Sequence, residues 1–436
     1  MKASNILGFN ARAQISYKYN KNWGKAVANS KLVTKKVLKK AGIAAPVLYK
    51  KFTRPQDIMS FSWESLPESF ALKPSRGLGG EGIIVVKKRS KDGSAWITTG
   101  RKKVTEDDIK LHTLDILEGA YSLEHSTDNA FVEEYVGRHK AFRRYAYRGT
   151  PDIRIVVFNK VPVMAMLRLP TKDSGGRANL HQGAIGVGVD IATGITTKAV
   201  WYGTEIKYKP GTKRKLHGIK IPNWTRILEM AVKCSEATLL GFLGVDVVLH
   251  PEKGPMVLEL NGQPGFQIQL ANEAGLKKRM DRVEDLEVRD AEHGVRIAKI
   301  LFAERFANRV NLEEGVKTLK PIEQVTLYAY GDKKRRITPA RIDTGARRTS
   351  VDRELARELG LLDEGNILWR NKYSYRSATG RQLRPVIGLT MKVAGRKLKT
   401  SASVANRTKM STPVLIGRND LEGFLVNPVH EEGKNV

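Results

Sequence analysis

Apolar and polar residues alternate in two runs within residues 244–266, and this pattern predicts two half-buried strands. The segment HPEKGP separates the runs and carries the Pro and Gly residues that are typical of a turn. We expect a hairpin in which Leu249 lies opposite Met256. One face of this hairpin is then apolar and the other polar.

The polar face of the hairpin carries Asp246, Glu259 and Asn261. The expected register puts Asp246 directly across from Glu259, with Asn261 one step along the same face. Three oxygen-bearing side chains that leave room for water and phosphate suit Mg²⁺ held against a nucleotide. A polar hairpin face in contact with solvent would show the same pattern, so the residues alone leave both interpretations open.

Nearer the N-terminus, apolar residues recur with helical spacing between Ser30 and Ala41. Gly42 stands where a helix would end, and Pro46 prevents its continuation. The intervening polar positions are mostly lysines. The pattern therefore predicts an amphipathic basic helix.

A predicted strand ending at Lys73 leads into a glycine-rich loop and then into a second apolar run at residues 83–86. The glycines of this loop are Gly77, Gly79, Gly80 and Gly82. Glycines let backbone N–H groups approach phosphate oxygens closely, and a lysine adds positive charge. Because a strand follows the loop, neither the Walker loop nor the dinucleotide fingerprint applies. A glycine-rich turn without a ligand is the alternative.

Three further strands follow from the apolar pattern. Residues 131–136 predict a short strand whose backbone could form hydrogen bonds with the edge of an adenine ring. An ordinary strand with two exposed acidic residues would show the same pattern. Residues 150–170 predict two strands around a turn at Asn159 and Lys160. The Gly-rich segment 172–190 predicts a long loop, and such loops are often functional.

After about residue 321 the pattern changes to short apolar runs between turn residues, which predicts an all-β region. Two of its segments are specific. The first is Asp343-Thr344-Gly345-Ala346, and the second is VLIGRN at residues 414–419. Their separation suits one small β domain.

The formal net charge of the chain is +31. Residues 320–436 contain 23 Lys and Arg against 12 Asp and Glu, a net of +11, which leaves +20 for residues 1–319. An excess of this size favours contact with polyanions such as RNA, ribosomes, acidic peptides or anionic membrane surfaces. A generally basic surface without a specific partner is the alternative.

Composition excludes several kinds of site. Cys234 is the only cysteine, so an intrachain disulfide and a cysteine-based zinc cluster are excluded, and the 8 histidines form no HExxH pair. No apolar run approaches the ~18 to 20 residues that span a bilayer. The first residues, MKASNILGFNARAQ, lack the apolar segment of a secretion signal, so we expect a cytoplasmic protein.

The order of these motifs resembles that of the ATP-grasp carboxylate-amine ligases. The series is Lys-Pro with a glycine loop, then EEYV, PDIR and RANLHQGA, and finally Asp246 with ELN. It is most similar to the branch that contains the ribosomal-protein glutamate ligases and the sugar-transfer associated ATP-grasp proteins, whose ELN-x-x-PG ending matches residues 259–265. The resemblance covers roughly residues 25–305.

The resemblance implies ATP and Mg²⁺ as cofactors, with two ions expected and Mn²⁺ as an alternative metal. It places Lys73 on the nucleotide phosphates, with Lys31 as a second lysine. Arg168 would hold the carboxylate substrate or stabilise its oxyanion, and Arg177 would reach the γ-phosphate and the acyl phosphate. The resemblance also places Gly79 and Gly80 at the phosphates, with Ala178 and Asn179 beside Arg177. It places Glu134, Tyr135 and Val136 at the adenine and ribose, and Asp152 at the nucleotide edge. The implied metal ligands are Asp246, Glu259 and Asn261, with Glu259 bridging two ions.

The implied reaction forms an amide bond. A carboxylate attacks the γ-phosphorus, so magnesium and arginine must offset the negative charges, and an amine then attacks the acyl phosphate. No nucleophilic side chain is required. The family's usual N-terminal α/β lobe has no counterpart in some 25 residues, so we expect the acceptor surface to come from elsewhere, such as the C-terminal region.

The C-terminal region resembles the retropepsin-like family once labelled "ATP-dependent zinc protease", which is encoded beside glutamate ligases. Residues 342–346 and 414–419 carry this resemblance. It implies a catalytic Asp343. Because two such carboxylates share one proton and the chain has one such motif, it also implies a homodimer. A catalytically inactive β module that docks substrate is the alternative.

We therefore expect an α+β ATP-grasp domain followed by a small all-β retropepsin-like domain. The expected boundaries are an N-terminal segment at 1–25, the ligase domain at 26–308, a linker at 309–321 and the protease domain at 322–436. The predicted function is Mg-ATP-dependent ligation of a carboxylate, from an amino acid or acidic peptide, to an amine, with an endopeptidase trimming the product. The alternative is a ribosome- or RNA-associated binding protein with a regulatory nucleotide fold.

Overall fold

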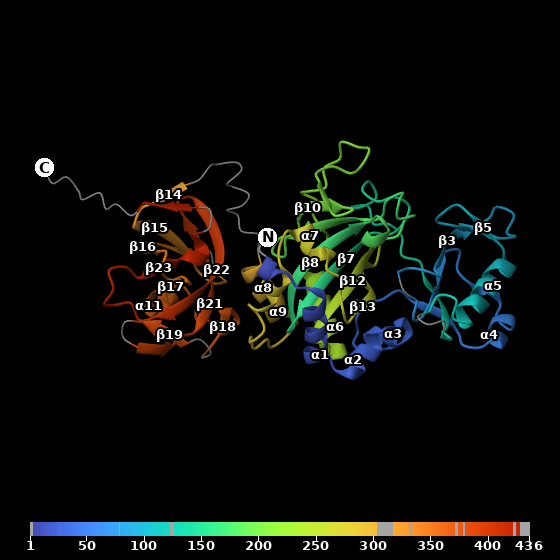
Figure 1. Ribbon diagram of the computed structural model, residues 1–436, viewed down its shortest axis with the longest axis horizontal. Helices are drawn as coiled ribbons and strands as arrows, with labels where there is room; N and C mark the ends of the chain where they lie inside the picture. Colours follow the sequence, from blue (N-terminus) through green and yellow to red (C-terminus); the bar gives the residue numbers. More distant parts are fainter. Residues whose placement is uncertain are drawn as a thin grey trace. The chain divides into compact units, whose positions relative to one another are not determined.

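The computed structural model describes residues 3–77, 79–122, 126–302, 317–331, 334–370, 374–377, 380–421 and 424–427. The chain divides into two compact units, Met1–Glu284 (unit 1) and Asp285–Val436 (unit 2), which Figure 1 colours along the sequence. Most of the predicted linker at 309–321 lies outside the described residues. Among the described residues, no helix has both the length and the apolar composition needed to cross a bilayer.

Unit 1 begins with three helices, α1 (Phe9–Tyr19), α2 (Asn22–Ala28) and α3 (Lys31–Lys40). The sequence pattern predicted α3. Ser30 caps its first turn by accepting a hydrogen bond from the Val33 N–H, as serine does at helix N-termini. Gly42 follows α3 with a φ of +66°, a backbone conformation that glycine adopts without strain. The predicted helix and its end are therefore confirmed.

The first sheet of unit 1 has the strand order β1-β6-β2-β3-β4-β5. These strands are β1 (Leu48–Phe52), β2 (Phe70–Pro74), β3 (Ile84–Arg89), β4 (Trp96–Thr98), β5 (Lys103–Val104) and β6 (Ala130–Glu134). Helices α4 (Pro55–Met59) and α5 (Glu106–Leu117) pack beside them around a core that contains Trp63 and Phe70. β2 and β3 are antiparallel, which confirms the predicted arrangement of strand, glycine loop and strand.

The second sheet of unit 1 is antiparallel and has the order β11-β10-β9-β8-β7-β12-β13. Its strands are β7 (Asp152–Phe158), β8 (Val161–Leu169), β9 (Ile185–Val189), β10 (Thr196–Trp201), β11 (Thr204–Ile206), β12 (Phe242–His250) and β13 (Gly254–Asn261). Helices α6 (Trp224–Thr238), α7 (Gln267–Asn272) and α8 (Leu276–Met280) pack on it. Asn159 and Lys160 both have positive φ and form the predicted turn between β7 and β8.

β12 and β13 form the predicted hairpin, and Asp246 pairs with Glu259 as expected. The predicted pairing of Leu249 with Met256 is wrong, because Met256 lies opposite Val248. An irregularity in the ladder directly after Asp246 shifts the register by one residue toward the loop. The polar pair is therefore preserved although the outer half of the hairpin is displaced.

Asn20, the C-cap residue of α1, fastens that helix to the hairpin. Its buried amide accepts a hydrogen bond from the Phe242 N–H at 2.9 Å and donates to the Phe242 carbonyl at 2.8 Å. It also donates to the Gly262 carbonyl at 3.0 Å, and Ser16 donates to the same carbonyl at 3.1 Å. α1 thus holds the chain at the point where it leaves β13, directly after Asn261.

We predict that Asn20→Ala lowers the free energy of unfolding of unit 1 by about 1–3 kcal/mol, because it leaves buried backbone groups of Phe242 without partners. Asn10→Ala, at an exposed position of the same helix, is the matched control and should change it by less than about 0.5 kcal/mol. Urea unfolding of the full chain measures both. Equal small effects would contradict the role given to Asn20.

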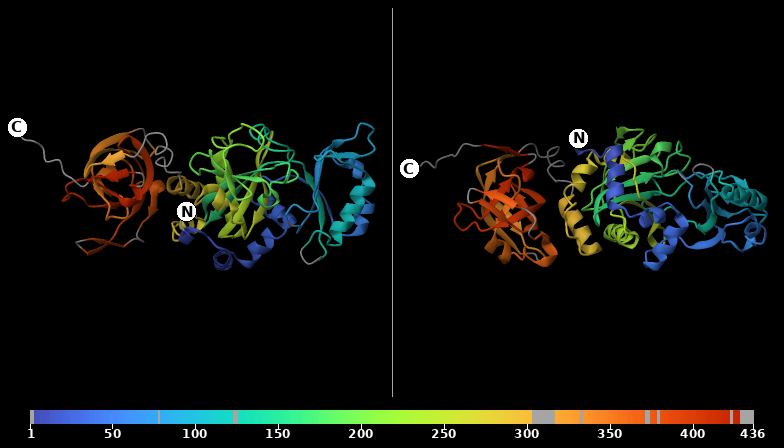
Figure 2. Two further views of the ribbon diagram at one scale, coloured as in Figure 1. Left: turned by 45° about the horizontal axis from the view of Figure 1, so that its top comes forward. Right: turned by 60° about the horizontal axis from the view of Figure 1, so that its bottom comes forward.

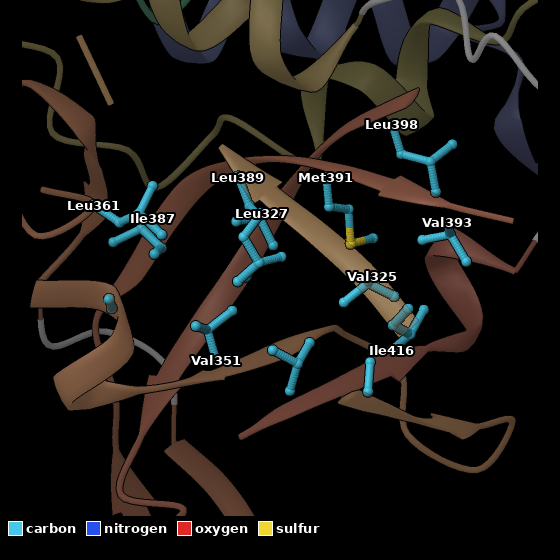
Figure 3. Close-up of a cluster of buried hydrophobic side chains, with 14 of the residues drawn as sticks. Val325, Leu327, Val351, Leu361, Ile387, Leu389, Met391, Val393, Leu398 and Ile416 are labelled. Carbon is cyan, nitrogen blue, oxygen red and sulfur yellow. The ribbon is translucent and has the colours of Figure 1, made fainter. Parts of the chain in front are cut away.

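Six of the described strands of unit 2 close into a barrel, which the left view of Figure 2 shows end-on as a ring of red and orange strands. The barrel order is β15-β16-β23-β17-β22-β21, and β21 pairs with β15 to close it. These strands are β15 (Ile322–Tyr328), β16 (Arg335–Asp343), β17 (Ser350–Asp352), β21 (Val386–Val393), β22 (Arg396–Ala405) and β23 (Val414–Gly417). Val325, Leu327, Leu389, Met391 and Ile416 are among the buried side chains that fill it (Figure 3).

Smaller elements complete unit 2. They are β14 (Lys317–Leu319), β18 (Ile367–Trp369), β19 (Ser374–Ser377), β20 (Gly380–Leu383), β24 (Phe424–Val426), α9 (Ala291–Leu301) and α11 (Arg353–Glu358). α9 packs on β21 and β22 and so lies in unit 2, before the predicted linker. The predicted all-β character holds for the barrel, but the pattern missed α11, whose single short stretch carries no long helical period.

Candidate functional site

The glycine loop between β2 and β3 has a backbone that favours glycine. Gly79, Gly80 and Gly82 have φ values of +63°, +81° and +66°. A Cβ on Gly82 would lie 2.5 Å from the ring of Tyr121, and His112 Nε2 is 2.9 Å from the Gly82 carbonyl oxygen. These contacts tie the Gly82 end of the loop to α5 and to the segment that follows it.

The prediction of a loop over all of residues 172–190 is wrong at its end, because Ile185–Val189 form β9. The part of the segment before that strand lies beside the glycine loop. A Cβ on Gly80 would lie 3.6 Å from Arg177 Cδ, and one on Gly79 would lie 3.8 Å from Asn179 Nδ2. Ala178 lies between these two residues. The structure thus brings together two groups of predicted site residues that are about a hundred positions apart in the sequence.

Lys31 connects the glycine loop to the hairpin. Its Nζ donates a hydrogen bond to the Gly77 carbonyl at 2.8 Å and lies 3.4 Å from Glu259 Oε1. The Lys31 side chain is 16% exposed and that of Glu259 is 37% exposed. A cation, the glycine loop and one predicted metal ligand therefore meet at a position that solvent reaches.

Lys73 is paired with Glu133, which is 2% exposed, and Lys35 Nζ lies 2.5 Å from the other oxygen of the same carboxylate. Burial acts to raise the pKa of Glu133, but the two ammonium groups outweigh it and hold that pKa below its usual value. Burial lowers the pKa of Lys35. Sequence reasoning missed Lys35 and Glu133, although Lys35 lies one helical turn beyond Lys31.

Glu134 holds the edge of the first sheet to the hairpin. Glu134 Oε2 accepts a hydrogen bond from the Val47 N–H at 3.2 Å, while Oε1 is paired with Lys253 and lies 3.5 Å from His250 Nε2. The neighbouring Val136 packs with Val248 and Met256 of the hairpin, and Tyr135 between them is half-buried. These predicted adenine and ribose residues therefore stand where the two sheets meet.

Four charged side chains form a buried network across β7, β8 and β12. Arg154 Nε and Nη2 each lie 2.7 Å from one oxygen of Asp246. Arg168 pairs with both oxygens of Asp152, at 2.5 and 2.7 Å, and its Nη2 also lies 2.7 Å from Asp246 Oδ2. Asp246 is 1% exposed, and Asp152 and Arg168 are also buried. The sequence pattern placed Arg154 near the start of a strand but did not predict its pairing with Asp246.

Burial and the arginines act in opposite directions on the two aspartates. For Asp152, burial dominates the attraction of Arg168 and raises its pKa to about 6. For Asp246, burial also acts to raise the pKa, but Arg154 and Arg168 together outweigh it and lower the pKa to about 2. Burial acts to lower the pKa of Arg168, but the two aspartates outweigh it and raise that pKa. Asp246 is therefore ionised throughout the physiological pH range.

The predicted metal ligands differ in whether other protein groups already occupy their polar atoms. Both oxygens of Asp246 are taken by guanidinium groups, whereas Glu259 is partly exposed. The Nδ2 of Asn261 is buried and has no hydrogen-bond partner among the described residues. Across the residues that the structure describes, no three His, Cys, Asp or Glu side chains form a cluster that could hold a metal. The Nδ2 of Asn261 is a donor and does not bind a cation, so the partly exposed carboxylate of Glu259 is the predicted ligand that suits a metal with other ligands from water or substrate.

We predict that Asp246→Asn lowers the free energy of unfolding of unit 1 by about 3–5 kcal/mol, because it leaves two arginines with a weakened partner. Glu259→Gln, the matched change in the cross-strand neighbour, should cost at most about 1 kcal/mol. Chemical unfolding at neutral pH measures both. Similar costs would contradict the distinction between a buried structural carboxylate and an exposed one.

The pH dependence gives a second readout for Asp246. Its folded-state pKa of about 2 lies below the ordinary value of 3.8, so its stabilising contribution is present above 3.8 and is lost as the pH falls through about 2. The stability difference between wild type and Asp246→Asn, measured by chemical unfolding at a series of pH values, should shrink below about pH 4. A second change is expected near pH 6, because the charge of Asp246 helps to raise the pKa of Asp152 to about 6 and the variant lacks that charge.

In unit 2, the structure brings the two specific segments of the sequence together. β16 and β23 pair in parallel, with Asp343 beside Gly417. Asp343 Oδ1 accepts hydrogen bonds from the Gly345 N–H at 2.9 Å and the Ala346 N–H at 3.0 Å, and the Arg418 N–H donates to the Ala346 carbonyl at 2.8 Å. The loop that presents the Asp343 carboxylate is thus fixed by the chain that follows β23.

A family model described as sugar-transfer associated ATP-grasp matches residues 10–285. No curated protein matches the chain. Similar solved structures include the ATP-grasp ligase PsnB with minimal precursor, Mg and ADP, at 15% identity and a TM-score of 0.35, and the D-alanine–D-alanine ligase of Bacillus anthracis with ATP, at 14% identity and a TM-score of 0.34. The match covers 61% of this chain and 60% of PsnB, and 64% of this chain and 70% of the Bacillus enzyme.

Proposed function

This chain belongs to the sugar-transfer associated ATP-grasp family, and we propose on that basis that unit 1 binds ATP with Mg²⁺ and joins a carboxylate to an amine. The observation that carries the proposal is the position of Lys31. Its ammonium group lies between the glycine loop and Glu259, so one cation reaches both a phosphate cradle and a metal-binding carboxylate.

The phosphates of ATP are assigned to the place where the glycine loop lies beside the segment that carries Arg177. Gly80 is close to Arg177 there and Gly79 to Asn179, with Ala178 between the two side chains, and we assign the phosphates to the N–H groups of the loop and to these side chains. Lys73 lies near the end of β2 with its ammonium group paired with Glu133, so it reaches the phosphates only when that pair opens. The junction of the two sheets at Glu134, Tyr135 and Val136 is the proposed adenine and ribose site, supported by the burial of this edge.

Glu259 and Asn261 are the proposed Mg²⁺ ligands. The partial exposure of the Glu259 carboxylate supports this assignment. Asn261 lies two residues farther along β13 and so on the same face of the hairpin, where its Oδ1 would be the ligand. When bound, Mg²⁺ offsets the negative charge of the phosphates during transfer to the carboxylate substrate. Asp246 contributes to the metal only when one of its guanidinium partners turns away, so in the present arrangement it fixes the hairpin instead.

Arg168 is proposed to offset the charge of the carboxylate substrate through the network that it forms with Asp152 and Asp246. Two arginines and two aspartates have no net charge, so Arg177 and Lys31 supply the excess positive charge that an incoming carboxylate and phosphate require. The amine then attacks the acyl phosphate. No covalent bond to the protein is needed.

We predict that the protein releases ADP from MgATP in the presence of a matching carboxylate and amine, with a product mass equal to their sum minus water. Glu259→Gln should reduce this activity at least about 100-fold, because it removes a charged metal ligand. Glu252→Gln, an exposed acid in the loop of the same hairpin, is the control and should retain activity. The screen covers amino acids and acidic peptides. ADP release that Glu259→Gln leaves unchanged would contradict the assigned site.

We further propose that unit 2 is an aspartic endopeptidase of the retropepsin type that acts as a homodimer. The support is the fixed presentation of Asp343 beside Gly417 in a closed barrel. One barrel supplies one such carboxylate, and the reaction needs two that share a proton, so the second Asp343 comes from another copy of the chain.

We predict that Asp343→Asn reduces peptide cleavage at least about 100-fold, because the variant cannot take up or give back the shared proton. ADP formation by unit 1 should be unchanged. Peptide mass spectrometry and the ADP assay measure the two activities in the same preparation, and sedimentation measures the oligomeric state. Equal loss of both activities would contradict the division between the units.

A further inference from the structure

Two segments of unit 1 are strongly basic and contain no acidic residue. Residues 137–151 carry five Lys and Arg, and residues 206–222 carry six. We call these two segments together the basic surface. Its cationic residues are Arg138, Lys140, Arg143, Arg144, Arg148, Lys207, Lys209, Lys213, Arg214, Lys215 and Lys220.

The two segments lie against each other although about 60 residues separate them. Lys209 Nζ donates to the Arg144 carbonyl at 3.3 Å, and the Arg214 guanidinium lies 5.6 Å from the centre of the Tyr145 ring. Partial burial, then the nearness of Arg214 and Arg138, lowers the pKa of Lys209. The cations therefore form one cluster.

The positive charge of the basic surface is not neutralised within the described part of the chain. None of its cations forms an ion pair with a described acid, whereas the cations of the site are paired with Asp246, Asp152 and Glu133. Most of them are exposed, including Arg143, Arg144 and Lys213. Gathering like charges without counter-charges is unfavourable unless an anion binds.

The basic surface adjoins the loop that carries Arg177. The Tyr147 N–H donates to the Pro170 carbonyl at 2.8 Å. A Cβ on Gly149 would lie 1.6 Å from the Gly176 carbonyl oxygen, so the two backbones are in direct contact. A chain lying on the basic surface would therefore have one end close to the proposed phosphate-transfer site.

We propose that the basic surface binds an acidic peptide, a chain of repeated carboxylates, whose end is the substrate of the ligase site. The choice of occupant rests on the proposed function: an acidic peptide carries the carboxylate that the adjoining ligase site takes, and RNA does not. Arg214 lies over Tyr145 and Arg148 lies over Tyr147 at 5.0 Å, which covers one face of each ring.

The test is binding of fluorescein-labelled hexaglutamate to the full chain, measured by anisotropy without nucleotide and with chelator, so that it does not depend on ligation. The triple variant Arg143→Glu, Arg144→Glu, Lys213→Glu reverses three exposed cations of the basic surface. It should bind the peptide at least about tenfold more weakly than wild type. An oligoribonucleotide with the same number of negative charges is measured in parallel.

The matched control is Lys87→Glu, Lys88→Glu, Lys91→Glu, which reverses three exposed cations on and after β3 and should bind within about twofold of wild type. Equal loss in both variants, no binding of the peptide by wild type, or tighter binding of the RNA would overturn the proposal. Peptide binding that depends on the basic surface but is not followed by MgATP-dependent ligation would support the surface and refute the proposed function.

Discussion

The pairing of Asp246 with Arg154 and Arg168 is the constraint on which the second sheet depends. Buried charges are costly unless each is paired, so these side chains tolerate few arrangements of β7, β8 and β12. A slip of one residue between two of these strands would move a charge to the other face of the sheet and leave its partner unpaired. The network therefore fixes the hairpin that carries Glu259 and Asn261.

A second set of charges joins the first sheet to this hairpin. Lys73 and Lys35 share the buried carboxylate of Glu133, while Lys31 reaches toward Glu259. The lysines differ in role although they lie close together in the fold. The two on Glu133 are held inside the protein by one shared carboxylate, whereas Lys31 faces a carboxylate that remains partly exposed. Of these three lysines, Lys31 keeps the charge best placed for a ligand.

Local periodicity predicted much of this arrangement. The two-residue period of the hairpin was enough to pair Asp246 with Glu259, and helical spacing with Ser30 and Gly42 gave α3. The partner of Asp246 was not predictable, because Arg154 lies 92 positions away and meets it through strand pairing that no local pattern encodes. For the same reason, the burial of Glu133 was not predictable: the alternative interpretation of its strand had two exposed acids, whereas the structure buries Glu133.

In the sequence pattern Asp246 and Glu259 are equivalent acidic residues on one face of a hairpin. In the structure their surroundings differ, and so do the roles that they can have. Two guanidinium groups neutralise Asp246, and a cation is not attracted to a carboxylate so closely paired. The proposed metal site then has one carboxylate, Glu259, and one amide, Asn261, which is a weak set for Mg²⁺ by itself. Mg²⁺ keeps several waters and takes phosphate oxygens readily. In such a site the nucleotide must supply the remaining charge, so metal and ATP bind together rather than in sequence.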